Sequence, residues 1–159
     1  MLKIIYLDMD GVLDNFDKRA DELDAWKKNE HKINWFKVDY IGSKFWSEIE
    51  PLANGMELYH KLLSLCEENG LELKILSAGP GDKCKQGKRE WLSKYCPEMK
   101  PENIIIKNKG VQKAELANSE SLLIDDSEKN CNSFFDAGGN VFRYKENPDD
   151  VIEYIKNRK

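Results

Sequence analysis

Five short runs of apolar and β-branched residues limit what this chain can fold into. The runs are nearly continuous rather than alternating, as in strands that are covered on both faces and are therefore parallel. They fall at residues 3–7, 73–77, 103–106, 121–124 and 140–144. Segments with helical spacing separate them, at residues 56–68, 83–95, 111–117, 128–137 and 149–156. This alternation predicts a doubly wound α/β domain with a mostly parallel five-stranded sheet.

Residues 15–51 do not fit this alternation. They separate the first predicted strand from its return helix, although a crossover needs only about a dozen residues. The segment is rich in charged and aromatic side chains. We therefore expect a single domain whose core comprises residues 1–14 and 52–159, with a small helical cap at about 15–51 over the carboxyl end of the first strand.

Composition argues against several classes of protein. The chain has 25 Lys and Arg against 29 Asp and Glu, and the resulting net charge of −4 disfavours a nucleic acid polymer as its ligand. No apolar stretch approaches the roughly 18 residues of a membrane span. The N-terminus enters a charged strand without the apolar core of a signal peptide. Four scattered cysteines indicate reduced thiols, so we expect a cytoplasmic protein without membrane partners.

Acidic residues end two of the predicted strands. Asp8 and Asp10 follow the first run, and Asp125 and Asp126 follow the fourth. Because ligands bind at the carboxyl ends of strands in an open parallel sheet, these carboxylates should converge if the two strands are neighbours. Hard oxygen ligands in one pocket favour Mg²⁺, which usually keeps waters and shares a phosphate. The alternative for Asp8 and Asp10 is a turn or a helix cap after the strand.

Phosphate binding is predicted at the end of the second strand. Ser77 and Ala78 would present a hydroxyl and backbone N–H groups where a loop opens a helix. A lysine would neutralise the remaining phosphate charge, and Lys88 and Lys113 are the candidates. Without the neighbouring motifs, each lysine would be interpreted as a solvated helix residue.

Together these features resemble the four motifs of the haloacid dehalogenase-like (HAD) phosphohydrolases. The matching strings are Asp8-Met-Asp10-Gly-Val-Leu, Ser77 after a strand, a downstream lysine and Leu-Leu-Ile-Asp125-Asp126. The resemblance implies a Rossmann-like three-layer sandwich, with Asp8 as the nucleophile that forms an aspartyl-phosphate and Asp10 as the general acid/base. It also implies Mg²⁺ on Asp8, the Asp10 backbone carbonyl and the acidic pair. In that pair we favour Asp126 as the direct ligand, with Asp125 behind it or bound through water.

The chain is similar in particular to the 5′(3′)-deoxyribonucleotidase branch of that family. The supporting strings are DMDGVLDNF, FWSEIEPLANG, LSAGP, KREWLSKY and a Lys-Ala pair followed by SLLIDD. The branch usually carries Thr-Ser after the second strand, where this chain has Ser77-Ala78. Phe16 matches a substrate-contacting aromatic of the branch, while Phe45 and Trp46 are candidates because they lie near the other end of the insert. Most aromatics of the insert are expected to form its own core.

We therefore expect an Mg²⁺-dependent phosphatase that hydrolyses small phosphate monoesters, with 5′(3′)-nucleotides as the first candidate substrates. Its partner would be a small phosphorylated metabolite such as a nucleoside monophosphate, and the protein would be a monomer or a homodimer. One rival is a phosphatase of a sugar phosphate or another metabolite. The other is a non-catalytic module that binds Mg²⁺ or accepts a phosphoryl group as a signal. Asp10 favours turnover, because it places an acid/base beside the nucleophile.

Overall fold

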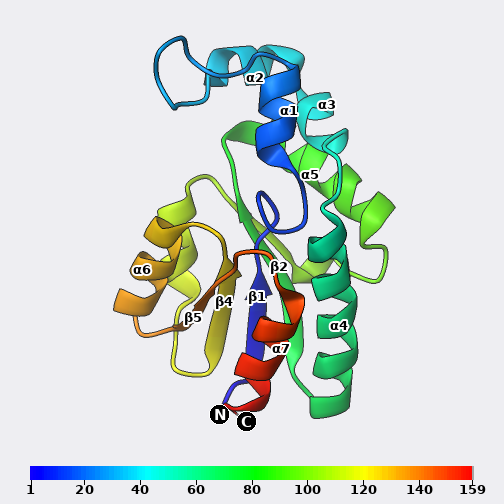
Figure 1. The fold of residues 1–159 in the computed structure, drawn as a ribbon, viewed down its shortest axis with the longest axis vertical. Helices are drawn as coiled ribbons and strands as arrows, with labels where there is room; N and C mark the ends of the chain where they lie inside the picture. The colour runs from blue at the N-terminus through cyan, green and yellow to red at the C-terminus, as the bar shows by residue number, and fades with distance from the viewer. Residues whose placement is uncertain (159) are drawn as a thin grey trace.

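A computed structural model describes residues 1–158 of the chain. One sheet of five parallel strands forms its centre, in the order β3-β2-β1-β4-β5 (Figure 1). The strands are Ile4–Leu7 (β1), Glu72–Ala78 (β2), Ile104–Lys107 (β3), Ser121–Asp125 (β4) and Asn140–Arg143 (β5). Each predicted strand is confirmed, with its ends displaced by no more than one residue.

Helices connect the strands in the predicted alternation. The α-helices of the core are Ala53–Asn69 (α4), Gly81–Tyr95 (α5), Glu128–Asp136 (α6) and Pro148–Lys156 (α7). Two 3₁₀ helices, Pro101–Asn103 (η1) and Gly110–Leu116 (η2), flank β3. The sequence places a helix correctly between β3 and β4, but the structure forms it with 3₁₀ geometry, as is common for short connecting segments.

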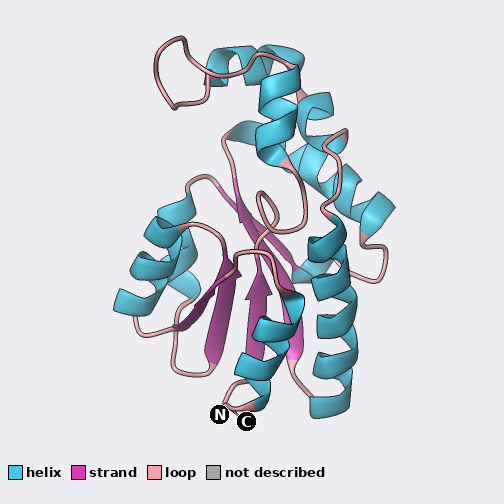
Figure 2. Cartoon of the chain, in the orientation of Figure 1, coloured by secondary structure: helices cyan, strands magenta, loops and turns pink. Residues whose placement is uncertain are grey.

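The two faces of the sheet bury separate sets of strand side chains. Alternate residues of a strand point to opposite faces. Ile5 and Ile75 belong to a large core cluster that also contains Trp91 of α5 and Val151 of α7. Tyr6, Leu76 and Leu123 point the other way and pack against Phe134 of α6. The result is the predicted three-layer sandwich, with α4 and α7 on one side of the sheet and α6 on the other (Figure 2).

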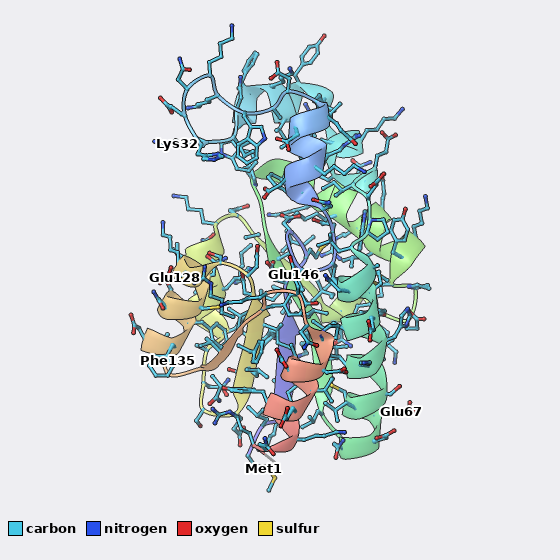
Figure 3. The ribbon with its side chains drawn as sticks, in the orientation of Figure 1. Met1, Lys32, Glu67, Glu128, Phe135 and Glu146 are labelled. Atoms are coloured by element: carbon cyan, nitrogen blue, oxygen red, sulfur yellow. The ribbon has the colours of Figure 1, made fainter. Side chains whose placement is uncertain are left out.

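The carboxyl ends of all five strands lie at one edge of the sheet. Leu7 pairs with both Ile75 and Ile124, so Asp8 emerges from the middle of this edge beside Asp125. The backbone N–H of Asp8 donates to the Ile124 carbonyl at 3.0 Å. Residues 15–51 lie beyond this edge, while the N-terminus, labelled as Met1 in Figure 3, and the end of α7 lie at the opposite end of the sheet.

Three short helices form the segment that we call the cap, residues 15–51. They are Phe16–Glu22 (α1), Trp35–Ile41 (α2) and Ser43–Ser47 (α3). The Arg19 guanidinium joins α1 to α3, because it donates to the carbonyls of Phe45 and Lys44 at 3.0 and 2.8 Å. The two segments that join the cap to the core are also hydrogen-bonded to each other, because the Leu52 N–H donates to the Leu13 carbonyl at 2.7 Å.

Helix α3 seats the cap directly on α5. A side chain at Gly87 would overlap the Ser43 carbonyl and the Cβ of Trp46, so the two helices approach more closely than any other residue would permit. The Trp91 indole N–H, also on α5, donates to the Ile49 carbonyl at 2.8 Å. The cap therefore contacts the core directly through α3 and α5, in addition to its two chain connections.

Gly87→Ala should test this packing. A helical alanine gains about 1 kcal/mol over glycine, but the overlap with the α3 backbone, at the upper end of the roughly 1–3 kcal/mol that overpacking costs, should outweigh it, for a net loss of about 1–2 kcal/mol in the free energy of unfolding. Urea denaturation followed by circular dichroism measures the change. Gln86→Ala, at an exposed position of the same helix, is the control and should stay within about 0.5 kcal/mol of the parent. A Gly87→Ala variant with unchanged stability would show that α3 is not closely packed on α5.

Candidate active site

Lys113 lies buried between two strand-end carboxylates. Its ammonium donates to Asp8 Oδ1 and to Asp125 Oδ2, each at 2.7 Å, and its side chain is only 2% exposed. The two aspartates are at the ends of the neighbouring strands β1 and β4, and Lys113 enters from η2. Burial works against the charge on Lys113, but the two carboxylates dominate and raise the pKa of its ammonium.

Asp125 is further held by its own loop. Its Oδ1 accepts a hydrogen bond from the Ser127 backbone N–H at 2.9 Å, and its Oδ2 accepts one from the Asn130 amide at 3.2 Å. Burial alone would raise the pKa of the Asp125 carboxyl, yet the charge of Lys113 and these hydrogen bonds lower it below its ordinary value. Asp125 is therefore an ionised, fully engaged carboxylate at the base of the site.

The negative charges of Asp8 and Asp126 are less fully balanced by neighbouring groups than that of Asp125. Burial, followed by the negative charge of Asp125, raises the pKa of both carboxyls, and that of Asp126 reaches about 6. Gly11 makes room for Asp126, because it adopts a left-handed φ of +80° and a side chain there would overlap the Asp126 carboxylate. The turn after β1 thus admits a third acid beside the other two.

These three carboxylates fit a divalent cation. One oxygen from each of Asp8, Asp125 and Asp126 lies within 4.8 Å of the others. The donors are hard oxygens, and one lysine cannot balance three negative charges at a site where Asp8 and Asp125 are both buried. A cation would offset the repulsion that raises the pKa values of Asp8 and Asp126. The cluster could therefore hold Mg²⁺ on Asp8 and Asp126, with Asp125 behind them, where it accepts from Lys113, Ser127 and Asn130.

A second buried lysine organises the neighbouring acid. The Lys88 ammonium, 1% exposed, donates to Asp10 Oδ2 at 2.8 Å, to Ser77 Oγ at 2.6 Å and to the Ala78 carbonyl at 2.8 Å. It also lies 4.9 Å from the centre of the Trp46 ring. Burial opposes its charge, but Asp10 raises the pKa of the Lys88 ammonium. Lys88 thus joins α5, the end of β2 and the turn after β1.

Asp14, in the turn after β1, is a further buried acid beside Asp10. Its side chain is 1% exposed, and burial together with the charge of Asp10 raises its pKa well above the ordinary value. Within residues 1–158, Asp10 Oδ1 and Asp14 Oδ1 are the buried side-chain polar atoms without a hydrogen-bond partner. The motif strings do not predict that Asp14 is buried, because its burial depends on how the turn after β1 folds back beneath the cap.

The aromatic candidates of the cap form one cluster. Phe16 lies 5.8 Å from Phe45 and 5.7 Å from Trp46, measured between ring centres. Phe45 has no exposed surface and Trp46 only 3%, so both belong mainly to the cap core. Trp35 stacks on Trp46 at 6.3 Å and remains 46% exposed. Sequence reasoning did not single out Trp35, whose exposure depends on the fold of the cap.

A cavity of about 590 Å³ adjoins the two lysine clusters. Its lining includes Ala78, whose carbonyl accepts from Lys88, and Asn130, whose amide donates to Asp125. Trp35 of the cap and Lys109 at the start of η2 also line it. The structure thus brings together Asp8, Asp10, Ser77, Ala78, Lys88, Lys113, Asp125 and Asp126 at the edge of the sheet. Their roles in catalysis remain predictions.

No known family profile matches the chain. A protein of Vibrio phage KVP40, provisionally named 5′(3′)-deoxyribonucleotidase, is 26% identical over 156 residues, which cover 96% of this chain and 84% of that protein.

Among the residues described, no helix has the length and apolar character needed to cross a membrane.

Solved structures share the architecture. L-2-haloacid dehalogenase of Xanthobacter autotrophicus with covalently bound chloropropionic acid has a TM-score of 0.56 and 12% identity, covering 89% of this chain and 76% of that one. A HAD-superfamily hydrolase of Ehrlichia chaffeensis has a TM-score of 0.54 and 15% identity, covering 99% and 98%. An Asp-to-Ala variant of a HAD-family enzyme of Bacteroides thetaiotaomicron, in complex with magnesium and inorganic phosphate, has a TM-score of 0.52 and 13% identity, covering 92% and 95%. The chain has the fold of the HAD-superfamily hydrolases.

Asp14→Asn should make stability less sensitive to rising pH. A carboxyl whose pKa is raised by folding contributes stability that is complete below its unfolded pKa of about 3.9 and is lost as pH rises through the folded pKa. The variant should therefore gain on the parent by roughly 1 kcal/mol or more between pH 5 and pH 8. Urea denaturation in EDTA across this range measures the difference. The exposed Asp136→Asn is the control for loss of one charge, and an equal gain there would refute the assignment.

Proposed function

We propose that this protein is an Mg²⁺-dependent phosphatase that hydrolyses small phosphate monoesters through an aspartyl-phosphate. The observation that carries the proposal is the separation of two acids at the end of β1. Asp8 is held by Lys113 in the carboxylate cluster, whereas Asp10 is held by Lys88 beside Ser77. This separation supports assigning the attack on phosphorus to Asp8 and the proton transfers to Asp10.

The Asp8 carboxylate would attack phosphorus. Its Oδ1 accepts from Lys113, and its Oδ2 accepts no hydrogen bond within residues 1–158. In the first step the bond from Asp8 to phosphorus forms while the bond from phosphorus to the leaving oxygen breaks. In the second step the oxygen of a water molecule attacks phosphorus and releases Asp8 as a carboxylate. Dividing the hydrolysis in this way replaces one difficult displacement with two easier ones.

Asp10 would carry the proton in both steps. Lys88 occupies its Oδ2 at 2.8 Å, while Oδ1 is buried without a partner among the described residues. The Asp10 carboxyl would give a proton to the leaving alkoxide in the first step. It would then accept a proton from the attacking water in the second, which returns Asp10 to its starting state. Lys88 fixes the orientation of the carboxyl throughout.

Other groups would bind the phosphate and balance its charge. Ser77 and the backbone at Ala78 lie at the end of β2, next to the Lys88 ammonium. Mg²⁺, when held by Asp8, Asp126 and the Asp10 carbonyl, would supply positive charge to the phosphoryl oxygens. Lys113 would stay on the carboxylates and keep Asp8 oriented, since its ammonium is already shared between Asp8 and Asp125.

We further propose nucleoside monophosphates as substrates. The support is the name of the phage relative, which is 26% identical over most of this chain, together with the similar motif strings. The Bacteroides enzyme with magnesium and phosphate supports the same reaction chemistry through its shared fold. Trp35, exposed over the cavity, offers a flat surface for a nucleobase.

Asp8→Asn should abolish turnover of p-nitrophenyl phosphate in Mg²⁺, with kcat reduced by at least about 10³-fold, because the amide cannot attack phosphorus. Circular dichroism and the urea midpoint check that the variant is folded. The matched control is the exposed Asp136→Asn, which should retain parental kcat. Near-normal turnover by the Asp8 variant would end the nucleophile assignment. A parent that forms a stable phospho-aspartate without repeated turnover would instead indicate the signalling module.

A panel of phosphate monoesters should rank nucleoside monophosphates above sugar phosphates in kcat/KM by about tenfold or more, which corresponds to about 1.4 kcal/mol of transition-state binding. Released phosphate is measured with each substrate. Parallel reactions in EDTA serve as the metal control and should show no turnover, with recovery on adding Mg²⁺. Nucleotides among the poorest substrates would favour the sugar-phosphate alternative, and full activity in EDTA would remove the metal from the proposal.

A further inference from the structure

The cavity beside the reaction centre is larger and more positively charged than a single phosphate requires. Its volume of about 590 Å³ falls in the range of small-molecule sites, roughly 300–1,000 Å³. The phosphoryl group itself would lie outside most of it, at Asp8 and the end of β2. The rest of the space is therefore available to the leaving group of the substrate.

Two lysines from different elements line this cavity. Lys109 stands at the start of η2, and Lys129 lies in the first turn of α6. Figure 3 labels the adjacent Glu128, which marks the end of α6 that faces the cap. Neither ammonium forms an ion pair or a hydrogen bond within residues 1–158, whereas nearby Lys107 is paired with Glu115 at 2.9 Å.

The remaining lining offers no negative charge to balance them. Within the described chain, the polar residues on the wall are the amides Asn108 and Asn130, and no acid lines the cavity. The acid that follows Ser127, Glu128, is directed to Arg143 at 3.5 Å instead. Two uncompensated ammonium groups and two amides on one wall form a surface that complements an anion with about two negative charges.

We propose that this wall binds a second phosphate group, carried by the leaving group of the substrate. The inference rests on the proposed function, because it assigns the first phosphate to the Asp8 centre. Lys109 and Lys129 would hold the second phosphate, and Asn108 would donate a further hydrogen bond. Trp35, Pro80 and Val111 supply apolar surface to the same cavity, so the connecting part of the substrate can be a nucleoside or another flat group. A substrate that carries a second phosphate should then bind more tightly than the corresponding monophosphate, so that among nucleotides a bisphosphate is preferred over the monophosphates proposed above.

Binding to a catalytically silent protein gives the sharpest test. In the Asp8→Asn background with Mg²⁺, isothermal titration calorimetry compares adenosine 3′,5′-bisphosphate with adenosine 5′-monophosphate, and fructose 1,6-bisphosphate with fructose 6-phosphate. The bisphosphate of at least one pair should bind about tenfold more tightly, equivalent to about 1.4 kcal/mol. Adding Lys109→Ala and Lys129→Ala should reduce this ratio to below about twofold.

Two remote lysines provide the matched control. Lys94 in the last turn of α5 and Lys100 directly before η1 are both exposed and do not line the cavity, and their double alanine variant should keep the tenfold ratio. The proposal is overturned if bisphosphate and monophosphate bind with equal affinity in both ligand pairs. It is also overturned if the affinity ratio persists without Lys109 and Lys129, or if it falls equally in the Lys94/Lys100 control variant. Failure of the wild-type protein to hydrolyse p-nitrophenyl phosphate would count against the phosphatase, whereas the binding ratio tests the second phosphate site separately.

Discussion

The buried lysine between Asp8 and Asp125 is the interaction on which the rest of the site depends. Two carboxylates at neighbouring strand ends repel each other in a medium of low dielectric, and removing the cation between them would leave buried charge without compensation. Lys113 lets β1 and β4 lie side by side up to their last residues. The remaining negative charge is confined to Asp8 and Asp126, where a cation could bind.

The same edge of the sheet carries a second lysine with a different task. Lys88 contacts Asp10 in the turn after β1, and the Ser77 hydroxyl and the Ala78 carbonyl at the end of β2; the Trp46 ring lies 4.9 Å from its ammonium. The two acids of the first motif therefore lie in different surroundings although only one residue separates them. Such a difference between neighbouring carboxyls is what a division between nucleophile and proton carrier requires.

Strand positions could be predicted because continuous apolar runs and strand-end acids are local signals. Asp8, Ser77 and Asp125 follow from them, once β1 is known to lie between β2 and β4. The pairing of each lysine could not be predicted, because Lys88 and Lys113 reach their partners across 78 and 105 residues of sequence. The burial of Asp14 and the exposure of Trp35 could not be predicted either, because both depend on how the charged, aromatic-rich segment 15–51 folds over the sheet.

The seating of α3 on α5 also determines where this architecture can change. Residues that touch α5 are fixed by the close approach at Gly87, so insertions there would displace Trp46 from Lys88. The loop between Trp26 and Ile33 is different, because it is closed on itself by a bridge between those two residues and lies at the far tip of the cap, where Figure 3 labels Lys32. Lineages could lengthen or shorten that tip and so acquire new substrates, while the chemistry below it stays undisturbed.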